Sequence, residues 1–421
     1  MKKNLFLFFV FIIIINTSYI HSVTVDNNKN LNLTMDKAVE MANKYNPSLK
    51  ALKFAIQAQK ENEKVAFSGY FPTINLNETP YFQNEQKGLQ NRISIEGRQL
   101  VYSFAGPLQQ LKIAQKQTDV AKLSEEERKD YLRYFVEASF LQSWLLQRKN
   151  KAIKTLNSSA DETIKKAEHQ NKLNLLSKNQ WLQDEATFAS NLANVYLYSD
   201  ELKNAQNQLE FYIGKQFESK DETITLIWDS KQEIKVENLE NYYQKAIKNR
   251  KDIQRKQKET EVFKETEYYY KKGNAPELKI MGSVSKDSNA YYNCHQVGLY
   301  LTWNIFDGGT KHYEQHKAHA EMLKALEEKE YLINQAKYDV QKAYNNLSIL
   351  LKQLAAQNIQ LTQAKNDYIL NKQKYEIGDI SKVDFEQAKY NWENQKFIWL
   401  SLKINTAVKE RELQYACGFP E

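Results

Sequence analysis

The chain has 421 residues, with 59 lysines and arginines against 52 aspartates and glutamates, a formal net charge of +7. Basic residues alternate with acidic ones, as on solvated helix faces, and this argues against nucleic acid as a partner. The 12 glycines and 6 prolines are far below the roughly 29 and 21 of average usage, so turns are rare and the segments between them must be long.

Residues 1–22 have the layout of a secretory signal peptide. Lys2 and Lys3 give a basic start, Leu5–Ile15 is an unbroken apolar run, and small or polar residues follow up to Ser22. The run is too short to cross a bilayer comfortably, so we expect a cleaved signal, with an uncleaved anchor as the alternative. The mature chain is therefore expected outside the cytoplasm.

The remainder of the sequence is one unit written twice. At a shift of 204 residues Pro72 falls on Pro276, whereas Gly106 meets Gly308 at a shift of 202. Such self-similarity indicates a duplication, and the slip of two residues should lie in loops. The predicted division is a first repeat at 23–214, a linker at 215–236 and a second repeat at 237–421.

Each repeat predicts a helix, a β-hairpin, a very long helix and a last helix. In the first repeat these are a helix at 35–69, a hairpin at 72–104 with strands 72–82 and 92–104, and helices at 107–172 and 177–213. In the second they are a helix at 239–272, a hairpin at 276–306 with strands 276–285 and 296–306, and helices at 310–377 and 381–416.

The strand segments alternate in polarity. Val297, Leu299 and Leu301 share one face of a strand whose other face carries Tyr300 and Thr302. A strand of about ten residues spans a bilayer at a tilt. A soluble hairpin with one wet face is the alternative that the strands alone leave open.

The long helices favour an extended architecture. About 65 residues make a rod of nearly 100 Å, which must pack along its length on other helices. Val340, Ala343 and Leu347 begin an apolar stripe with the 3.5-residue period of coiled coils. Each long helix is therefore expected to pair with the shorter helix that follows it.

Four strands per chain cannot close a pore, because a lipid-facing sheet must leave no edge unpaired. Three copies would supply twelve strands and a ring of helices. The predicted fold is mainly α with a small β part: long antiparallel coiled-coil helices forming an α-barrel, and four strands contributing to a 12-stranded trimeric transmembrane β-barrel.

Three motifs carry a family resemblance. Residues 33–47 read LTMDKAVEMANKYNP, residues 301–309 read LTWNIFDGG and residues 375–384 read YEIGDISKVD. They resemble the opening helix, the strand-to-helix transition and the inner tip turn of the outer-membrane efflux protein family, the TolC-type exit ducts. The resemblance covers nearly the whole mature chain.

The resemblance implies a homotrimer in outer-membrane lipid, with its helical tunnel in the periplasm. Its tip would dock on a periplasmic adaptor (membrane fusion) protein that belongs to an inner-membrane transporter. The implied function is a passive channel of a tripartite efflux pump or a type I secretion system, with drugs, metals and polypeptides all open as cargo. A secreted structural coiled-coil stalk or an adhesin is the alternative.

Several residues are candidates for positions in such a duct. Asp384 and Tyr375 match family positions at the pore aperture; a helix N-terminal acid is the alternative role for Asp384. The expected strand-to-helix hinges are Gly106, Gly308 and Gly309, and the expected adaptor-facing tip turns contain Asn174, Leu175, Gly378 and Asp379. The sequence departs from the family pattern at Ala105, Gln180, Ile380 and Gln387.

Other reactive side chains are few. His312, His316 and His319 share one helical face at a spacing able to bind a transition metal, but a plain polar face is the favoured interpretation. No motif predicts catalysis or a cofactor. Cys294 and Cys417 should lie far apart in this layout and stay unpaired.

Overall fold

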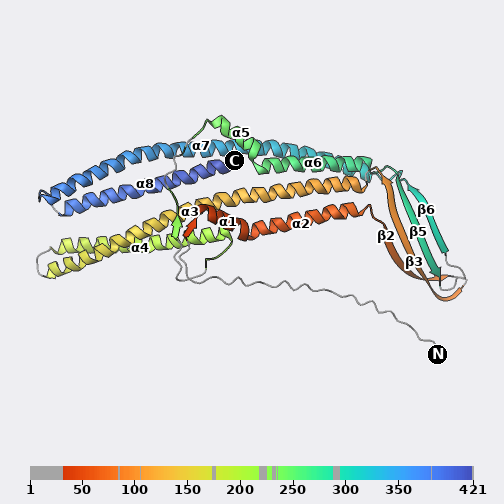
Figure 1. Cartoon of the computed structure of the whole chain (residues 1–421), viewed down its shortest axis with the longest axis horizontal. Helices are drawn as coiled ribbons and strands as arrows, with labels where there is room; N and C mark the ends of the chain where they lie inside the picture. Colours follow the sequence, from red (N-terminus) through yellow and green to blue (C-terminus); the bar gives the residue numbers. More distant parts are fainter. Residues whose placement is uncertain are drawn as a thin grey trace, which may run out of the picture.

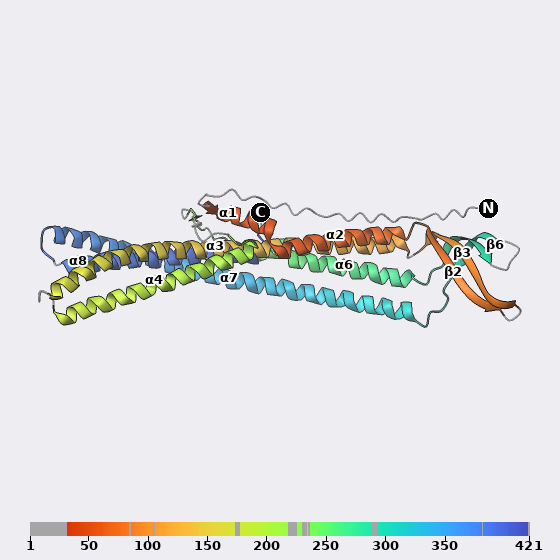
Figure 2. The same cartoon turned by 90° about the horizontal axis from the view of Figure 1, so that it is seen from below.

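The computed structural model describes residues 32–83, 86–104, 106–172, 177–217, 225–229, 234, 236–287, 294–380 and 382–419. The predicted signal peptide lies outside these residues. The molecule is elongated: a sheet stands at one end, two helical hairpins reach the other, and short elements surround the middle (Figures 1 and 2). The predicted fold class, mainly α with a small β part, is confirmed.

Eight helices appear in the described part of the chain. Two long ones, α3 and α7, run the length of the rod and each pairs with the shorter helix that follows it, as expected (Figure 1). The first-repeat helices are α1 (Met35–Tyr45), α2 (Pro47–Ser68), α3 (Pro107–Lys172) and α4 (Lys178–Ile213). Those of the second are α5 (Leu239–Asn249), α6 (Lys251–Lys272), α7 (Thr310–Glu376) and α8 (Lys382–Ala416).

The expectation of one continuous first helix in each repeat was wrong. The helix is broken at Asn46 and at Arg250, both with φ −60° and ψ 123°. Pro47 explains the first break, because proline disfavours helical geometry in the residue before it. The second break has no proline, so its cause is tertiary packing.

Two glycines supply that packing. Gly214 and Gly418 follow α4 and α8 with φ +75°, and a Cβ atom there would lie 2.6 Å from Asn46 Cα and 2.7 Å from the Arg250 nitrogen, respectively. The helix that ends and the helix that breaks therefore meet backbone to backbone in both repeats.

A short parallel sheet, absent from the sequence prediction, lies beside the middle of α3. It pairs β1 (Asn32–Thr34) with β4 (Thr225–Ile227), so the predicted linker at 215–236 contains a strand. Leu33 and Leu226 point into a core that also contains Val136, Phe140 and Ile213. A second core is built from α5, α6, α7 and α8, around Val340 and Leu347 of the predicted stripe.

The main sheet has the order β2–β3–β5–β6 and is antiparallel throughout. Its last strand ends at Thr302, so residues 303–306, which were predicted to belong to it, are not in a strand. β3 begins six residues earlier than predicted. The strands are β2 (Thr73–Gln83), β3 (Gln86–Ser103), β5 (Glu277–Asp287) and β6 (Cys294–Thr302).

Candidate functional site

The main sheet has one apolar face that the described part of this chain leaves uncovered. Cross-strand partners in an antiparallel sheet point to the same side, and the pairs Leu76–Ile95, Ile95–Val284 and Ile280–Leu299 place apolar side chains together. Leu76 is 72% exposed and Leu299 69%. Further exposed apolar members of this face are Ile74, Ile93, Val297 and Leu301.

The opposite face of the sheet is polar and charged. The pair Asn75–Glu96 continues to Ser283 and Gln296 across the four strands. Neighbouring positions on this face include Arg98, whose guanidinium lies 3.4 Å from the Glu96 carboxylate. The sheet therefore has the two-sided character that a wall between lipid and water requires.

Exposed aromatic side chains gather where the sheet meets the helices. They come from the end of α2, the end of β3, the end of α6 and the segment after β6. Trp303 is 61% exposed and Phe306 is 83% exposed. Other members are Phe67, Tyr70, Phe71, Tyr102, Phe104 and Tyr268.

The predicted hinges lie at this junction. Gly308 and Gly309 have φ +72° and +85°, the left-handed region that glycine adopts readily. Asp307, which the motif contains but the sequence analysis gave no role, accepts hydrogen bonds from the Gly309 and Lys311 amides at 3.0 Å and so caps α7. At Gly106 the reason for glycine is space rather than backbone conformation, because a Cβ there would lie 2.8 Å from Ser103 Cβ.

At the far end, α7 closes into a tight turn. Gly378 has φ +81°, and the amides of Gly378 and Asp379 donate to the carbonyls of Tyr375 and Lys374, which is a Schellman motif. Asn174 and Leu175 of the matching turn lie outside the described residues. Asp384 is exposed in the first turn of α8, Ile380 is half-buried and Gln387 is exposed.

Tyr375 takes part in a ladder of stacked rings between α7 and α8. Its ring lies 5.1 Å from that of Phe385 at an interplanar angle of 9°. Tyr368 stacks on the other side, 5.9 Å from Phe385 and 4.8 Å from Trp392. The ladder fixes the register of the α7–α8 hairpin close to its tip.

The three histidines do not converge on one centre. The rings of His312 and His316 are 4.4 Å apart, whereas His319 lies 3.4 Å from the Glu267 carboxylate on α6. Within the described part of the chain no three metal-ligating side chains come together. Likewise, no helix there is long and apolar enough to cross a membrane.

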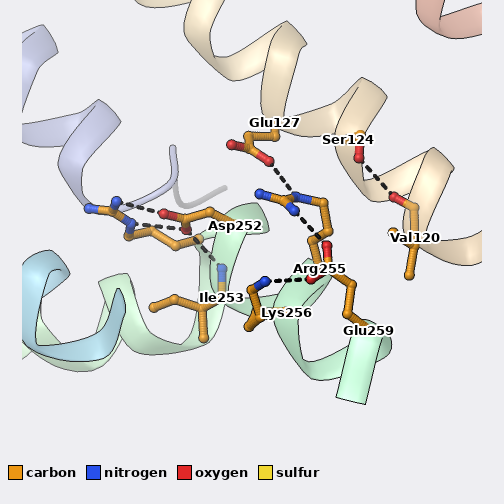
Figure 3. A network of polar contacts seen from close by, with 9 residues as sticks. Val120, Ser124, Glu127, Asp252, Ile253, Arg255, Lys256 and Glu259 are labelled. Atoms are coloured by element: carbon orange, nitrogen blue, oxygen red, sulfur yellow. Dashed lines mark hydrogen bonds and ion pairs between the residues drawn. The ribbon is translucent and has the colours of Figure 1, made fainter. Parts of the chain in front are cut away.

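Ion pairs that could not be predicted from the sequence join the two repeats. Arg255 of α6 lies 2.9 Å from Glu127 of α3 and 2.6 Å from Glu259 in its own helix (Figure 3). Lys256 bridges from Glu259 to Glu328 of α7. Lysine and glutamate are so frequent that no local pattern could have identified these partners.

The break at Arg250 is held by the same kind of contact. Arg250 binds Asp252 through two nitrogens at 3.1 and 2.7 Å and reaches Asp339 of α7 at 3.0 Å. Nearby, a hydrogen bond from Lys116 of α3 holds the pKa of Glu261 on α6 below its usual value. The helical wall is thus fixed crosswise by charge-assisted contacts.

Comparison with known proteins points to one family. Residues 242–418 match the model of the outer membrane efflux protein family. No curated protein sequence matches the chain. The resemblance drawn from the three motifs is confirmed.

Solved structures share the fold over nearly the whole chain. The Campylobacter jejuni CmeC outer membrane channel superposes with a TM-score of 0.73 at 14% identity, covering 94% of this chain and 90% of that one. A membrane protein from Pseudomonas aeruginosa gives 0.72 at 15% identity, with 91% and 92% covered. The open state of the Neisseria gonorrhoeae MtrE outer membrane channel gives 0.70 at 14% identity, with 94% and 93% covered.

Proposed function

We propose that this chain, whose second half matches the outer membrane efflux protein family, is one protomer of a trimeric outer-membrane duct. The duct would carry substrates passively from the periplasm to the exterior. The observation that carries the proposal is the four-stranded sheet with one exposed apolar face and one polar face.

The sheet is incomplete in a single chain. Its outer strands β2 and β6 each have a partner on one side only within the described chain. In a bilayer both free edges must be paired, because no water is available to satisfy the backbone groups. Three chains with four strands each would close a barrel of twelve, with the polar face toward an aqueous lumen.

The aromatic residues at the junction support a membrane boundary at that level. Aromatic side chains with a polar atom, such as those of Trp303 and Tyr102, favour the interface between lipid and water, where an amphipathic ring is stable. The strands would then lie in the outer membrane and the helices would extend into the periplasm. A secreted stalk or adhesin would leave the apolar face without a role.

The tips of the two helical hairpins would meet a periplasmic adaptor protein that belongs to an inner-membrane transporter. CmeC and MtrE, which share the fold, are outer membrane channels, and this supports the same type of role here. The pump would be of the tripartite efflux or the type I secretion class. We propose Asp384 and Tyr375 as residues of the narrowest part of the lumen, and the turn at Gly378 and Asp379 as part of the docking tip.

The test is oligomeric mass and conductance of the purified protein. In mild detergent the mass should be that of three chains, and in a planar bilayer the protein should open discrete ion-conducting steps. A monomer as the only stable species would refute the proposal.

A further inference from the structure

The start of α7 carries a pair of histidines that the proposed function does not use. His312 and His316 lie four residues apart, in the first two turns of the helix. Residues with this spacing lie one above the other on the same helix face, with Cβ atoms about 5–6 Å apart. Of the six histidines in the sequence, these are the only two separated by four residues. One helix face therefore presents two imidazoles together.

The two rings already have nearly the separation that a shared metal ion requires. The ring centroids of His312 and His316 are 4.4 Å apart, with planes inclined by 76°. Two imidazoles bound to one ion at a metal–nitrogen distance of about 2.0–2.1 Å have centroids about 4.5 Å apart at a right angle and about 5.2 Å apart at the tetrahedral angle. Rotation of the two side chains covers this difference, so the helix backbone can stay in place.

The nitrogens of both rings are available. His312 and His316 are exposed, and neither forms a hydrogen bond or an ion pair with another residue of the described part of the chain. Their ring contacts there are with Tyr313 and with each other. Neutral imidazole is the side chain that most often binds a metal in proteins. A metal ion can therefore bind here without breaking an existing polar contact.

The third histidine of this face has a different partner. His319 Nδ1 lies 3.4 Å from the Glu267 carboxylate of α6, so its ring is drawn toward the neighbouring helix. No group of three metal-ligating side chains is found in the described residues. The site that the structure offers thus has two protein ligands, and water would fill the remaining positions, as it does at open metal sites.

The charges around the pair are already balanced by partners of their own. The Nζ of Lys311 lies over two tyrosine rings of α6, 5.5 and 5.6 Å from their centroids, and that of Lys317 lies 3.6 Å from the Glu314 carboxylate. The positive end of the helix dipole disfavours a cation. At α7 it is offset by the Asp307 carboxylate, which accepts hydrogen bonds from the amides of Gly309 and Lys311.

We propose that His312 and His316 bind one divalent ion of a late first-row transition metal per chain. Imidazole suits copper, nickel and zinc, and the affinity of such a nitrogen site rises from Mn²⁺ to Cu²⁺. The bound ion joins the first and second turns of α7 directly behind the hinge at Gly308 and Gly309. Because one helix supplies both ligands, this inference does not depend on the proposed trimer.

The test is metal titration of the full chain, purified without a histidine tag and carrying Cys294→Ser so that this thiol does not compete. Isothermal titration with Ni²⁺, Zn²⁺ and Cu²⁺ should show one ion per chain, and Mg²⁺ should give no binding. Outer-shell partners alone are worth about 10- to 100-fold in metal affinity, so losing a ligand through His312→Ala or His316→Ala should cost at least about tenfold. His319→Ala is the matched control and should bind as the unmodified protein does.

A second control keeps the number of histidines constant. His316→Gln combined with Ala320→His places the two rings about 12 Å apart along the helix axis, so this variant should bind no more tightly than His316→Ala. The electron paramagnetic resonance spectrum of bound Cu²⁺ should show two imidazole nitrogens in the unmodified protein and one in either alanine variant. Circular dichroism checks that each variant keeps its helix content.

Three results would overturn the assigned site. They are an affinity unchanged in His316→Ala, an equal loss of affinity in His319→Ala, and full affinity in the variant with the displaced histidine.

Discussion

Replacing Gly418 by alanine should weaken the middle of the rod through two separable effects. The residue has φ +75°, a conformation that costs an L-residue about 1–2 kcal/mol. A Cβ there would also lie 2.7 Å from the Arg250 nitrogen and 2.8 Å from Asn249 carbonyl carbon. These are backbone atoms, so relief requires the end of α8 to move away from the start of α6.

Overpacking of this kind typically costs about 1–3 kcal/mol, so the total expected loss is about 2–5 kcal/mol. Gly378→Ala is the matched control. Its φ is +81°, but nothing lies within 4 Å of the added Cβ, so only the conformational cost of about 1–2 kcal/mol applies. Gly214→Ala should behave as Gly418→Ala does, because its Cβ would lie 2.6 Å from Asn46 Cα.

The assay measures the urea midpoint of unfolding of the detergent-solubilised protein by tryptophan fluorescence. The temperature at which the trimer dissociates is measured as well. The expected order of stability is unmodified protein, then Gly378→Ala, then the two junction variants. A junction variant no less stable than Gly378→Ala would show that the close backbone approach does not hold the helix break.

Three further outcomes are expected. Asp384→Asn should lower the cation preference of the conducting channel, since three symmetry-related carboxylates would be neutralised; unchanged selectivity in an intact trimer would remove Asp384 from the lumen. Burial raises the pKa of Asp130 to about 6, against the opposing charges of Lys251 and Arg133, so the folded state holds this proton more tightly than the unfolded state. The contribution of Asp130 to stability should therefore rise as pH falls from about 7 to 4. Measured across this range, the urea midpoint of the unmodified protein relative to that of Asp130→Asn should increase toward low pH. Burial also raises the pKa of the free Cys417 thiol to about 12, so maleimide at pH 8 should label this residue only after unfolding, which peptide mapping would check.

Local patterns predicted the order and type of the main elements, because their causes are local. A sustained coiled-coil period fixes a long helix, and Pro107 and Gly378 mark a start and an end that the structure reproduces. Alternation of polarity located β5 and β6 but placed the end of β6 too late. Trp303 and Ile305 continue the alternation although residues 303–306 are not in a strand, so alternation alone does not determine where a strand ends.

Features determined by distant partners could not be predicted. Nothing near Arg250 signals a helix end, since lysine and aspartate follow it and both fit a helix. The break depends on Gly418 and on Asp339, which is 89 residues away. The pair β1–β4 is three residues long on each side, too short for any alternation to be visible.

Tyr375 has a structural contact that the family resemblance could not predict. The motif places Tyr375 with Asp384 at a pore aperture. Which ring of α8 lies against Tyr375 depends on the register of α7 and α8 across the turn. That register sets Tyr375 against Phe385 and Tyr368 against both Phe385 and Trp392. The Tyr375 ring therefore stabilises the hairpin itself. Of the two residues proposed for the narrowest part of the lumen, Asp384 carries the charge and is exposed, so Asp384→Asn is the substitution that tests ion selection at this tip.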